Sequence, residues 1–98
     1  MTLTRTGFAA SLNWNLLKIF HHIVSANGIT AASVALSRKQ STISHALKQL
    51  EDELGMRLCL RGPSGFKLTD EGQILFEYCE SIQRKIDELP SKLDNLAE

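Results

Sequence analysis

The sequence of 98 residues predicts a mainly α-helical domain, in which three helices and a short β-hairpin precede one long helix. Apolar residues recur at helical spacing in two segments of the first half, and a short run rich in small residues lies between them. Two β-prone runs flank the turn-forming segment GPSG. Residues 70–98 then carry a long apolar series at alternating steps of four and three.

The first two helices are predicted between residues 13 and 36. Residues 1–12 show no strong periodicity, and we expect them to form a loose arm. From Asn13 to Ala26 an apolar stripe indicates a helix that Asn13 caps and the segment ANG ends. Thr30 is expected to cap a short helix over residues 31–36, whose small side chains allow a neighbouring helix to approach closely.

The third helix is predicted from about residue 40 to residue 54, after a turn at SRK and before Gly55. Its apolar residues recur at steps of 4, 3 and 4 and mark a buried face: Ile43, Leu47, Leu50 and Leu54. At about 100° per residue, a polar set points away from that face: Ser41, His45, Lys48 and Asp52.

A hairpin and a long helix complete the chain. The segments RLCLR and FKLT, separated by GPSG at 62–65, predict the hairpin. Thr69 or Asp70 is expected to cap the long helix. The apolar series of this helix is typical of a coiled coil and comprises Leu75, Cys79, Ile82, Ile86, Leu89, Leu93 and Leu96. Pro90 interrupts the series and is expected to kink or end the helix near Leu89.

Charge is distributed unevenly along the chain. The formal net charge is zero, but every acid lies at Glu51 or beyond. Five cations and no carboxylate precede that point, whereas six cations face eleven acids after it, so the halves carry +5 and −5. Such asymmetry indicates that one half meets a polyanion, and it favours nucleic acid over the alternative of scattered solvated charge.

Other features exclude several classes of protein. Cys59 and Cys79 lie far apart, so we expect reduced, packed thiols, with a disulfide as the alternative. No Cys/His spacing resembles a zinc site, and no metal or cofactor is expected. No apolar run approaches the roughly 20 residues that a membrane-spanning helix needs, and the N-terminus lacks the pattern of a secretion signal. We therefore expect a cytoplasmic protein without a membrane partner.

The order of a short helix, a tight turn, a longer helix and a hairpin is that of a winged helix-turn-helix. In such a motif the second helix of the pair enters the major groove, with its N-terminal residues toward base edges. The basic, hydroxyl-rich start of the third helix suits that position, and its acidic end, EDE, suits the place where the helix leaves the groove. The alternative is that the polar face is only solvated.

From Trp14 to about Ile82 the sequence resembles the N-terminal DNA-binding domain of LysR-type transcriptional regulators. The segments that carry the resemblance are ITAASVALSRKQSTISHALKQLEDELGMRLCLR and, further on, LTDEG. The resemblance implies a bacterial homodimeric transcription factor that recognises an interrupted dyad in double-stranded DNA. Residues 13–69 would form the winged DNA-binding domain, and residues 70–98 the linker helix that forms the dimer. The family's C-terminal domain, which binds a small-molecule inducer, is absent from this sequence, so we expect a fragment.

The resemblance also assigns roles to single residues. In the major groove, the helix at about 40–54 would read bases through Gln40, Ser41, Ser44 and His45. The other DNA-binding residues near that helix would be Thr30, Arg38, Lys39, Thr42 and Lys48, with Thr30 and Lys48 on phosphates. The wing at about 57–69 would reach the minor groove through Arg61, Ser64 and Lys67. The dimer contacts would be Leu75, Cys79, Ile82, Ile86 and Leu89.

Two positions depart from the family's pattern. Lys39 stands where the family usually has a serine that caps the recognition helix, and lysine cannot accept that hydrogen bond. We expect Ser41 or Ser37 to cap the helix instead, or its first turn to fray until phosphate orders it. Cys59 replaces a common phenylalanine, and we expect a smaller packed side chain, with a redox switch as the alternative.

Three other classes of protein compete with this interpretation. A winged-helix module that binds a protein through residues 41–52 is the main alternative, and a winged-helix DNA-binding protein of another family is the second. An enzyme is not expected, because the sequence offers no converging acid, base and nucleophile. Failure to bind random duplex DNA at low salt would favour the protein partner.

Overall fold

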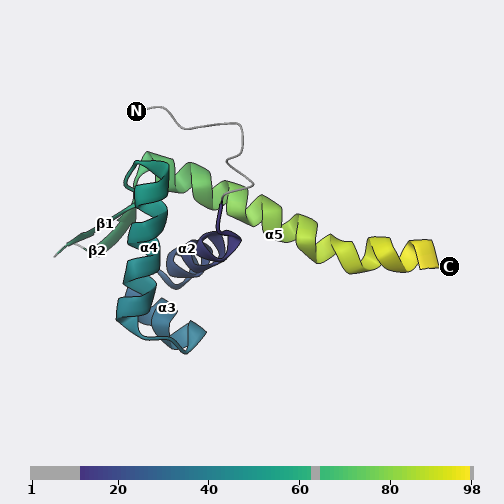
Figure 1. Ribbon diagram of the computed structural model, residues 1–98, viewed down its shortest axis with the longest axis horizontal. Helices are drawn as coiled ribbons and strands as arrows, with labels where there is room; N and C mark the ends of the chain where they lie inside the picture. The colour runs from purple at the N-terminus through teal and green to yellow at the C-terminus, as the bar shows by residue number, and fades with distance from the viewer. Residues whose placement is uncertain (1–11, 63–64, 98) are drawn as a thin grey trace.

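The computed structural model describes residues 12–62 and 65–97 of the chain. In chain order its elements are α2 (Trp14–Ala26), α3 (Ile29–Leu36), α4 (Gln40–Leu54), β1 (Cys59–Gly62), β2 (Gly65–Leu68) and α5 (Asp70–Ala97). Helices α2, α3 and α4 and the hairpin form a head, residues 14–62 and 65–68, from which α5 projects as a long arm (Figure 1). This arrangement confirms the predicted winged helix-turn-helix with a long final helix. Of the arm expected over residues 1–12, residues 1–11 lie outside the described residues.

Four element ends agree with the expectations from sequence. The Asn13 side chain accepts a hydrogen bond from the Asn15 N–H at 3.0 Å and caps α2. Asn27 (φ 62°) ends α2 and Gly55 (φ 72°) ends α4, both in the left-handed conformation. The Thr69 hydroxyl accepts from the N–H of residue 72 at 3.0 Å and caps α5. Each cap satisfies backbone groups that a helix end otherwise leaves without partners.

The start of α3 differs from the expectation. The helix begins at Ile29 with Gly28 as its cap, so Thr30 lies inside the helix and does not cap it. Gly28 has a φ of 148°, which a residue with a side chain rarely adopts. With the turn at Gly28, the helix begins earlier in the chain than predicted, at Ile29. The first N–H groups of a helix have no intrahelical partners, and no side-chain hydrogen bond caps this end to replace them.

The first turn of α4 also contradicts the expectation. Lys39 is its cap residue and no side-chain hydrogen bond closes it, yet the turn is formed. The N–H groups of Thr42 and Ile43 donate to the Lys39 carbonyl at 3.1 and 3.2 Å. The expectation that Ser37 or Ser41 caps the helix, or that the turn frays, is therefore wrong. Ser37 is instead the C-cap of α3, with a φ of 54°, and Ser41 lies inside α4.

The core lies between α2, α4 and the base of the hairpin. Phe20 and Ile23 of α2 are fully buried, and the predicted buried face of α4 is confirmed in full: Ile43, Leu47, Leu50 and Leu54. Leu58 and Cys59 add side chains from the hairpin base, each about 1% exposed. Cys59 is therefore the packed residue that the sequence predicts.

The hairpin is a two-stranded antiparallel sheet, as predicted. Its register pairs Cys59 with Leu68 at the base and Gly62 with Gly65 near the tip. Gly65, the first residue of β2, has a φ of 109°, a conformation that favours glycine. Ser64, which the resemblance places among the DNA contacts, lies outside the described residues.

Helix α5 runs through Pro90 to Ala97, so it does not end near Leu89, and of the two effects expected at Pro90 only a kink stays a prediction. Proline removes one backbone hydrogen bond from a helix, but a helix can accommodate that loss without ending. Among the described helices, none is long and apolar enough to cross a membrane by itself, and α2 and α3 meet that test only as a pair bent by 116°.

The first half of α5 packs on α2. Cys79 is only 6% exposed, and its Sγ lies 3.9 Å from the Leu17 carbonyl oxygen. Nearby, His21 Nε2 and Glu80 Oε2 are 2.6 Å apart, and the His21 ring stacks on Phe76. Cys79 therefore belongs to the core of its own chain, and its predicted part in the dimer contact stays a prediction.

Candidate nucleic-acid interface

Helix α4 presents its polar face on the outside of the head. The residues predicted to face DNA are exposed, apart from Ser44, which is half-buried: Gln40, Ser41, Thr42, His45 and Lys48. The apolar residues on the opposite side of the helix hold it in this orientation, because the core buries them. Short side chains in its first two turns allow a partner to approach the helix closely, and no acid lies there.

A groove of about 360 Å³ opens between the starts of α3 and α4 and the hairpin. Its lining includes five of the predicted site residues: Thr30, Gln40, Ser41, Ser44 and Arg61. The N-termini of α3 and α4, which no side chain caps, begin beside this groove. Their free N–H groups and the positive ends of the helix dipoles favour an anionic partner.

A second groove, of about 530 Å³, lies between the later turns of α4 and the base of the hairpin. Ser44 and Arg61 line both grooves, so the two form one continuous surface. Lys48 and Arg57 bring positive charge to it. Lys48 Nζ is 3.5 Å from Asp52 Oδ2, but both side chains are largely exposed, and such a pair contributes little. Lys48 can therefore exchange Asp52 for a phosphate at small cost.

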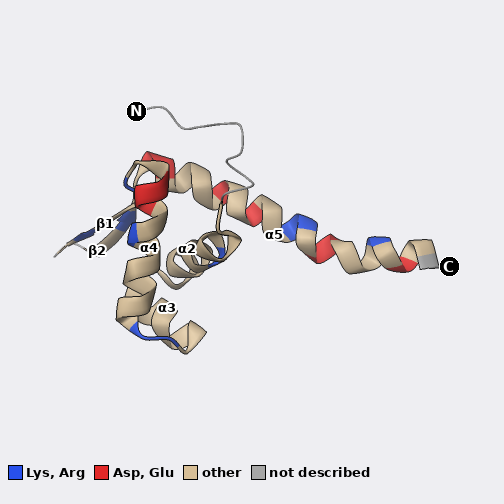
Figure 2. Cartoon of the chain, in the orientation of Figure 1, with Lys and Arg blue, Asp and Glu red and all other residues tan. Residues whose placement is uncertain are grey.

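Charged side chains follow the pattern that the sequence predicts. Figure 2 shows Lys and Arg on the turn before α4 and on the hairpin, and Asp and Glu at the end of α4. Arg38 and Lys39 lie exposed on that turn, and Lys67 lies exposed on β2. These three cations flank the two grooves without lining them.

The two cysteines are buried free thiols. Burial, together with the nearby Glu51 carboxylate, raises the pKa of Cys59 to about 12. Burial also raises the pKa of Cys79 to about 11. Both groups therefore stay protonated near neutral pH, and a protonated thiol is a poor nucleophile. This environment argues against the alternative of a redox switch at Cys59.

The role of Glu51 is not evident from the charge pattern, which groups it with the acids at the end of the third helix. Its side chain is only 12% exposed and accepts hydrogen bonds from the hairpin backbone. One signal in the sequence was available, because Glu51 lies four residues after Leu47 and three before Leu54, at the edge of the apolar stripe. A carboxylate in that position needs partners, and the hairpin supplies them.

Together these features define a winged helix-turn-helix protein whose recognition helix is exposed and free of acids in its first turns. Residues 14–73 match the family described as bacterial regulatory helix-turn-helix protein, lysR family. Because the match covers more than half of the chain, the chain belongs to the LysR family. The resemblance found in the sequence is thereby confirmed.

Curated relatives agree with this assignment. The HTH-type transcriptional activator BauR of Pseudomonas aeruginosa is 34% identical over 90 residues, which cover 92% of this chain and 30% of BauR. The HTH-type transcriptional regulator GltR of Bacillus subtilis is 35% identical over 77 residues, which cover 79% of this chain and 26% of GltR. The chain thus spans less than a third of the length of these relatives.

Solved structures share the same arrangement of head and long helix. The complex of the BenM DBD with catB site 1 DNA has a TM-score of 0.79 and 28% identity, covering 89% of this chain and 98% of the BenM chain. The complex of the CbnR DBD with DNA has a TM-score of 0.78 and 25% identity, covering 89% and 100%. Full-length LysG from Corynebacterium glutamicum has a TM-score of 0.79 and 26% identity, covering 87% and 29%.

Proposed function

We propose that this chain binds double-stranded DNA with sequence preference, as a homodimer that regulates transcription. The observation that supports this most strongly is the outward-facing start of α4, beside a groove that the hairpin borders on one side. The first 50 residues contain no carboxylate, so the negative phosphates of DNA meet no like charge there. As in other motifs of this class, α4 would enter the major groove and the wing would lie toward the minor groove.

Four residues of α4 would read base edges: Gln40, Ser41, Ser44 and His45. Gln40 carries an amide that can form a bidentate contact with the N6 and N7 atoms of adenine. Ser44 is half-buried between the two grooves, so only a base edge that approaches the helix closely could reach it. His45, one turn beyond Ser41, is exposed and can contact either a base or a phosphate.

The remaining polar residues would bind the DNA backbone, which positions a protein without reading sequence. Thr30 lies in the first turn of α3 and Lys48 in the middle of α4, on either side of the base-reading set. The other backbone contacts would come from Arg38, Lys39 and Thr42 before and within α4, whereas Arg61, Ser64 and Lys67 of the wing would reach the minor groove. Each phosphate contact by a cation releases counterions and makes binding sensitive to salt.

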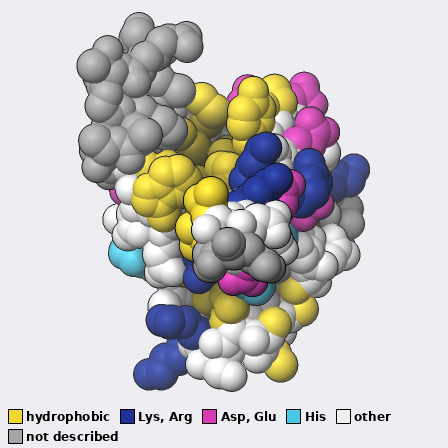
Figure 3. Space-filling view, turned by 90° about the vertical axis from the view of Figure 1, so that its right-hand side faces the viewer, with side chains coloured by type: hydrophobic (Ala, Val, Ile, Leu, Met, Phe, Trp, Pro, Cys, Tyr) yellow, Lys and Arg dark blue, Asp and Glu magenta, His cyan; other side chains and the backbone are white. Residues whose placement is uncertain are grey.

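The dimer would form through α5. An apolar groove of about 320 Å³ between α2 and α5 is lined by Trp14, His21, Ile82 and Ile86, among others. From there an exposed apolar stripe continues along α5: Ile86, Leu89, Leu93 and Leu96. Figure 3 shows hydrophobic side chains gathered beside Lys and Arg on the side from which α5 projects. A second copy would cover this surface and fix the separation of two recognition helices, hence of two half-sites.

The relatives are named as transcriptional activators and regulators, and we infer no catalytic role for this chain. A regulator that binds the bacterial chromosome works in the cytoplasm. The small-molecule inducer that the resemblance implies would bind a domain outside this sequence.

Selection of bound duplexes from a random pool tests the proposed function. We expect an interrupted dyad to be enriched, because two recognition helices related by a twofold axis read two half-sites. We also expect affinity for random duplex to fall by on the order of 10³-fold between about 50 mM and about 200 mM salt, from several phosphate contacts. A chain that binds no duplex even at low salt would instead support the protein-binding alternative.

Two single variants test the division between base readers and phosphate contacts. His45→Ala should change the preferred base at one position of the selected site, with a cost of about 1–3 kcal/mol there. Lys48→Ala should weaken all duplexes almost equally and reduce the salt slope by about one. Affinity measured on matched and mismatched duplexes distinguishes them. Equal losses on every sequence for both variants would contradict the assignment.

A further inference from the structure

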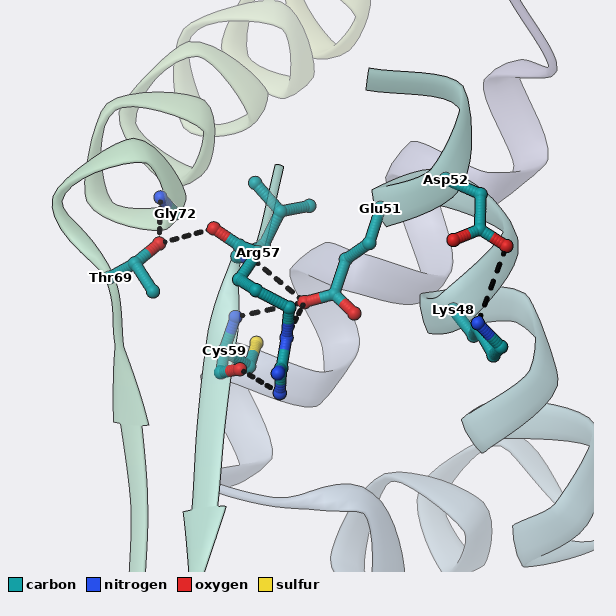
Figure 4. A network of polar contacts seen from close by, with 8 residues as sticks. Lys48, Glu51, Asp52, Arg57, Cys59, Thr69 and Gly72 are labelled. Atoms are coloured by element: carbon teal, nitrogen blue, oxygen red, sulfur yellow. Dashed lines mark hydrogen bonds and ion pairs between the residues drawn. The ribbon is translucent and has the colours of Figure 1, made fainter. Parts of the chain in front are cut away.

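One carboxylate of the recognition helix is bonded to the base of the wing. Glu51 Oε2 accepts hydrogen bonds from the N–H groups of Leu58 at 2.7 Å and of Cys59 at 3.2 Å. The same oxygen lies 3.5 Å from Arg57 Nε. Figure 4 shows the Glu51 side chain reaching from α4 to these groups beside β1. A single oxygen on α4 thus binds three consecutive residues at the point where the chain enters the wing.

The same network continues into α5. Arg57 Nη2 donates to the Cys59 carbonyl at 3.1 Å, and the Thr69 hydroxyl donates to the Arg57 carbonyl at 2.7 Å. The Thr69 N–H donates to the Leu58 carbonyl at 3.0 Å, and the Gly72 N–H donates to the Thr69 hydroxyl at 3.0 Å. We call this set the polar strap: Glu51, Arg57, Leu58, Cys59, Thr69 and Gly72. It connects the recognition helix, the wing and the linker helix.

The orientation of the wing depends on such a connection. A two-stranded hairpin is only marginally stable by itself, and each strand here has four residues. Arg61 lies two residues beyond Cys59 on β1, and it lines both grooves together with Ser44 of α4. The hydrogen bonds from Leu58 and Cys59 to Glu51 therefore hold the start of β1, the strand that carries Arg61.

We propose that Glu51 is a positioning residue, which holds the base of the wing against the recognition helix. In this position Arg61 and Lys67 can contact DNA while the side chains of α4 contact the bases. This inference rests on the proposed binding of duplex DNA. It adds a role for an acid in an interface that otherwise consists of cations and hydroxyls. Glu51 contacts the backbone of Leu58 and Cys59 and the Arg57 side chain, and its proposed role is to position the wing instead of contacting DNA.

The chain offers a matched control for Glu51. Glu53 lies two residues further along α4, is exposed, and bonds only the neighbouring side chain of Gln49, at 3.3 Å, in the described residues. Glu53→Ala therefore removes the same charge from the same helix without touching the strap. Glu51→Ala removes both hydrogen bonds to the wing. Glu51→Gln keeps an acceptor oxygen and loses only the charge.

The test uses a duplex selected by the unaltered 98-residue chain. Hydroxyl-radical footprinting reports minor-groove protection at the edges of each half-site, and guanine methylation reports the major groove. For Glu51→Ala we expect the edge protection to disappear, the major-groove protection to persist and the affinity to fall about tenfold, since the wing is no longer held where Arg61 and Lys67 contact DNA. Glu51→Gln should restore most of the edge protection, and Glu53→Ala should leave it intact.

Amide hydrogen exchange gives a second readout that does not need DNA. The N–H groups of Leu58 and Cys59 should exchange faster in Glu51→Ala than in Glu53→Ala, while the amides of α2 keep their protection. If Glu51→Ala does not fold, Glu51→Asp replaces it, because its shorter side chain keeps the charge but cannot reach both amides.

The outcomes separate the two proposals. If the unaltered chain binds duplex and Glu51→Ala retains full edge protection with unchanged exchange at Leu58 and Cys59, the role of Glu51 is refuted and DNA binding stands. If edge and groove protection are lost together while the fold persists, Glu51 has no specific role in placing the wing. If the unaltered chain binds no duplex at all, both proposals fail.

Discussion

The two halves of α5 follow one apolar repeat but lie in different surroundings. In the first half Cys79 is 6% exposed and packs on α2, whereas in the second half Ile86 and Leu89 are 61% and 51% exposed. The repeat does not distinguish them, because steps of four and three place all of these residues on one face. The difference arises because the head covers α5 only as far as the groove that Ile82 and Ile86 line. One repeat can thus form a contact within the chain in the first half of α5 and, as we propose, a contact between two copies in the second half.

The largest effect is expected where the repeat is buried. Cys79→Asp places a carboxylate in the apolar contact between α2 and α5, and we expect it to lower the free energy of unfolding by roughly 4 kcal/mol. Leu93→Asp, on the exposed half, is the control and should change it by less than about 0.5 kcal/mol at protein concentrations where the chain is monomeric. Urea unfolding measures both. Similar losses would show that the two halves are equally buried.

The exposed half should control association instead of folding. Ile86→Glu combined with Leu89→Glu places two charges on the proposed dimer surface, and we expect the dimer dissociation constant to rise about 100-fold, or about 2.7 kcal/mol. Sedimentation equilibrium measures this change. Lys85→Glu, which alters charge on the same helix beside the stripe, is the control. An unchanged dissociation constant in the double variant would place the dimer contact elsewhere.

A substitution at Gly72 tests how closely the packed first half of α5 approaches the base of the wing. A Cβ atom at this position would lie 2.1 Å from the Leu58 carbonyl oxygen, which belongs to the backbone and cannot move aside alone. We expect Gly72→Ala to cost about 2 kcal/mol of unfolding free energy, because the start of α5 must shift. Thermal unfolding beside Gln73→Ala, an exposed neighbour, measures the difference. Equal stability of the two variants would mean that the start of α5 is not fixed.

The smallest effect concerns the side-chain pair that joins α5 to α2. Glu80→Gln weakens the contact with His21, whose nitrogen is 2.6 Å from the carboxylate, and we expect a loss of about 0.5–1 kcal/mol because the pair is partly exposed. Glu77→Gln is the control, since Glu77 bonds Gln73 within α5. A double-mutant cycle with His21→Gln isolates the pair, and a coupling energy near zero would show that packing alone holds this half.

The sequence predicts the end of a helix correctly where residues next to each other in the chain are enough to form it. Asn13 caps α2 and Gly55 ends α4, because a side-chain acceptor or a left-handed residue suffices at those points. The start of α3 and the capping residues of α3 and α4 were predicted wrongly, since Gly28 caps α3 in place of Thr30 and Ser37 ends α3 instead of capping α4. The end expected near Pro90 was also wrong, because the helix tolerates the lost hydrogen bond.

In the candidate site, too, the sequence predicts some features correctly and misses others. The order of elements and the charge pattern predict an exposed, acid-free face, and the structure places Gln40, Ser44 and Arg61 around one groove, as a winged motif requires. The bonds from Glu51 to the wing could not be predicted, because they join residues seven and eight positions apart across the turn at Gly55. Their geometry depends on how the hairpin base packs on the core.

The sequence by itself determined the class of fold, the buried face of α4 and the family, because periodicity, turn residues and an ordered motif are properties of the chain alone. Only the tertiary structure decided which turns of α5 are covered, which helix ends remain uncapped and which acid supports the wing. The physical reason is that burial and hydrogen bonding depend on the distance between segments, and a repeat along one helix carries no information about where its neighbour ends.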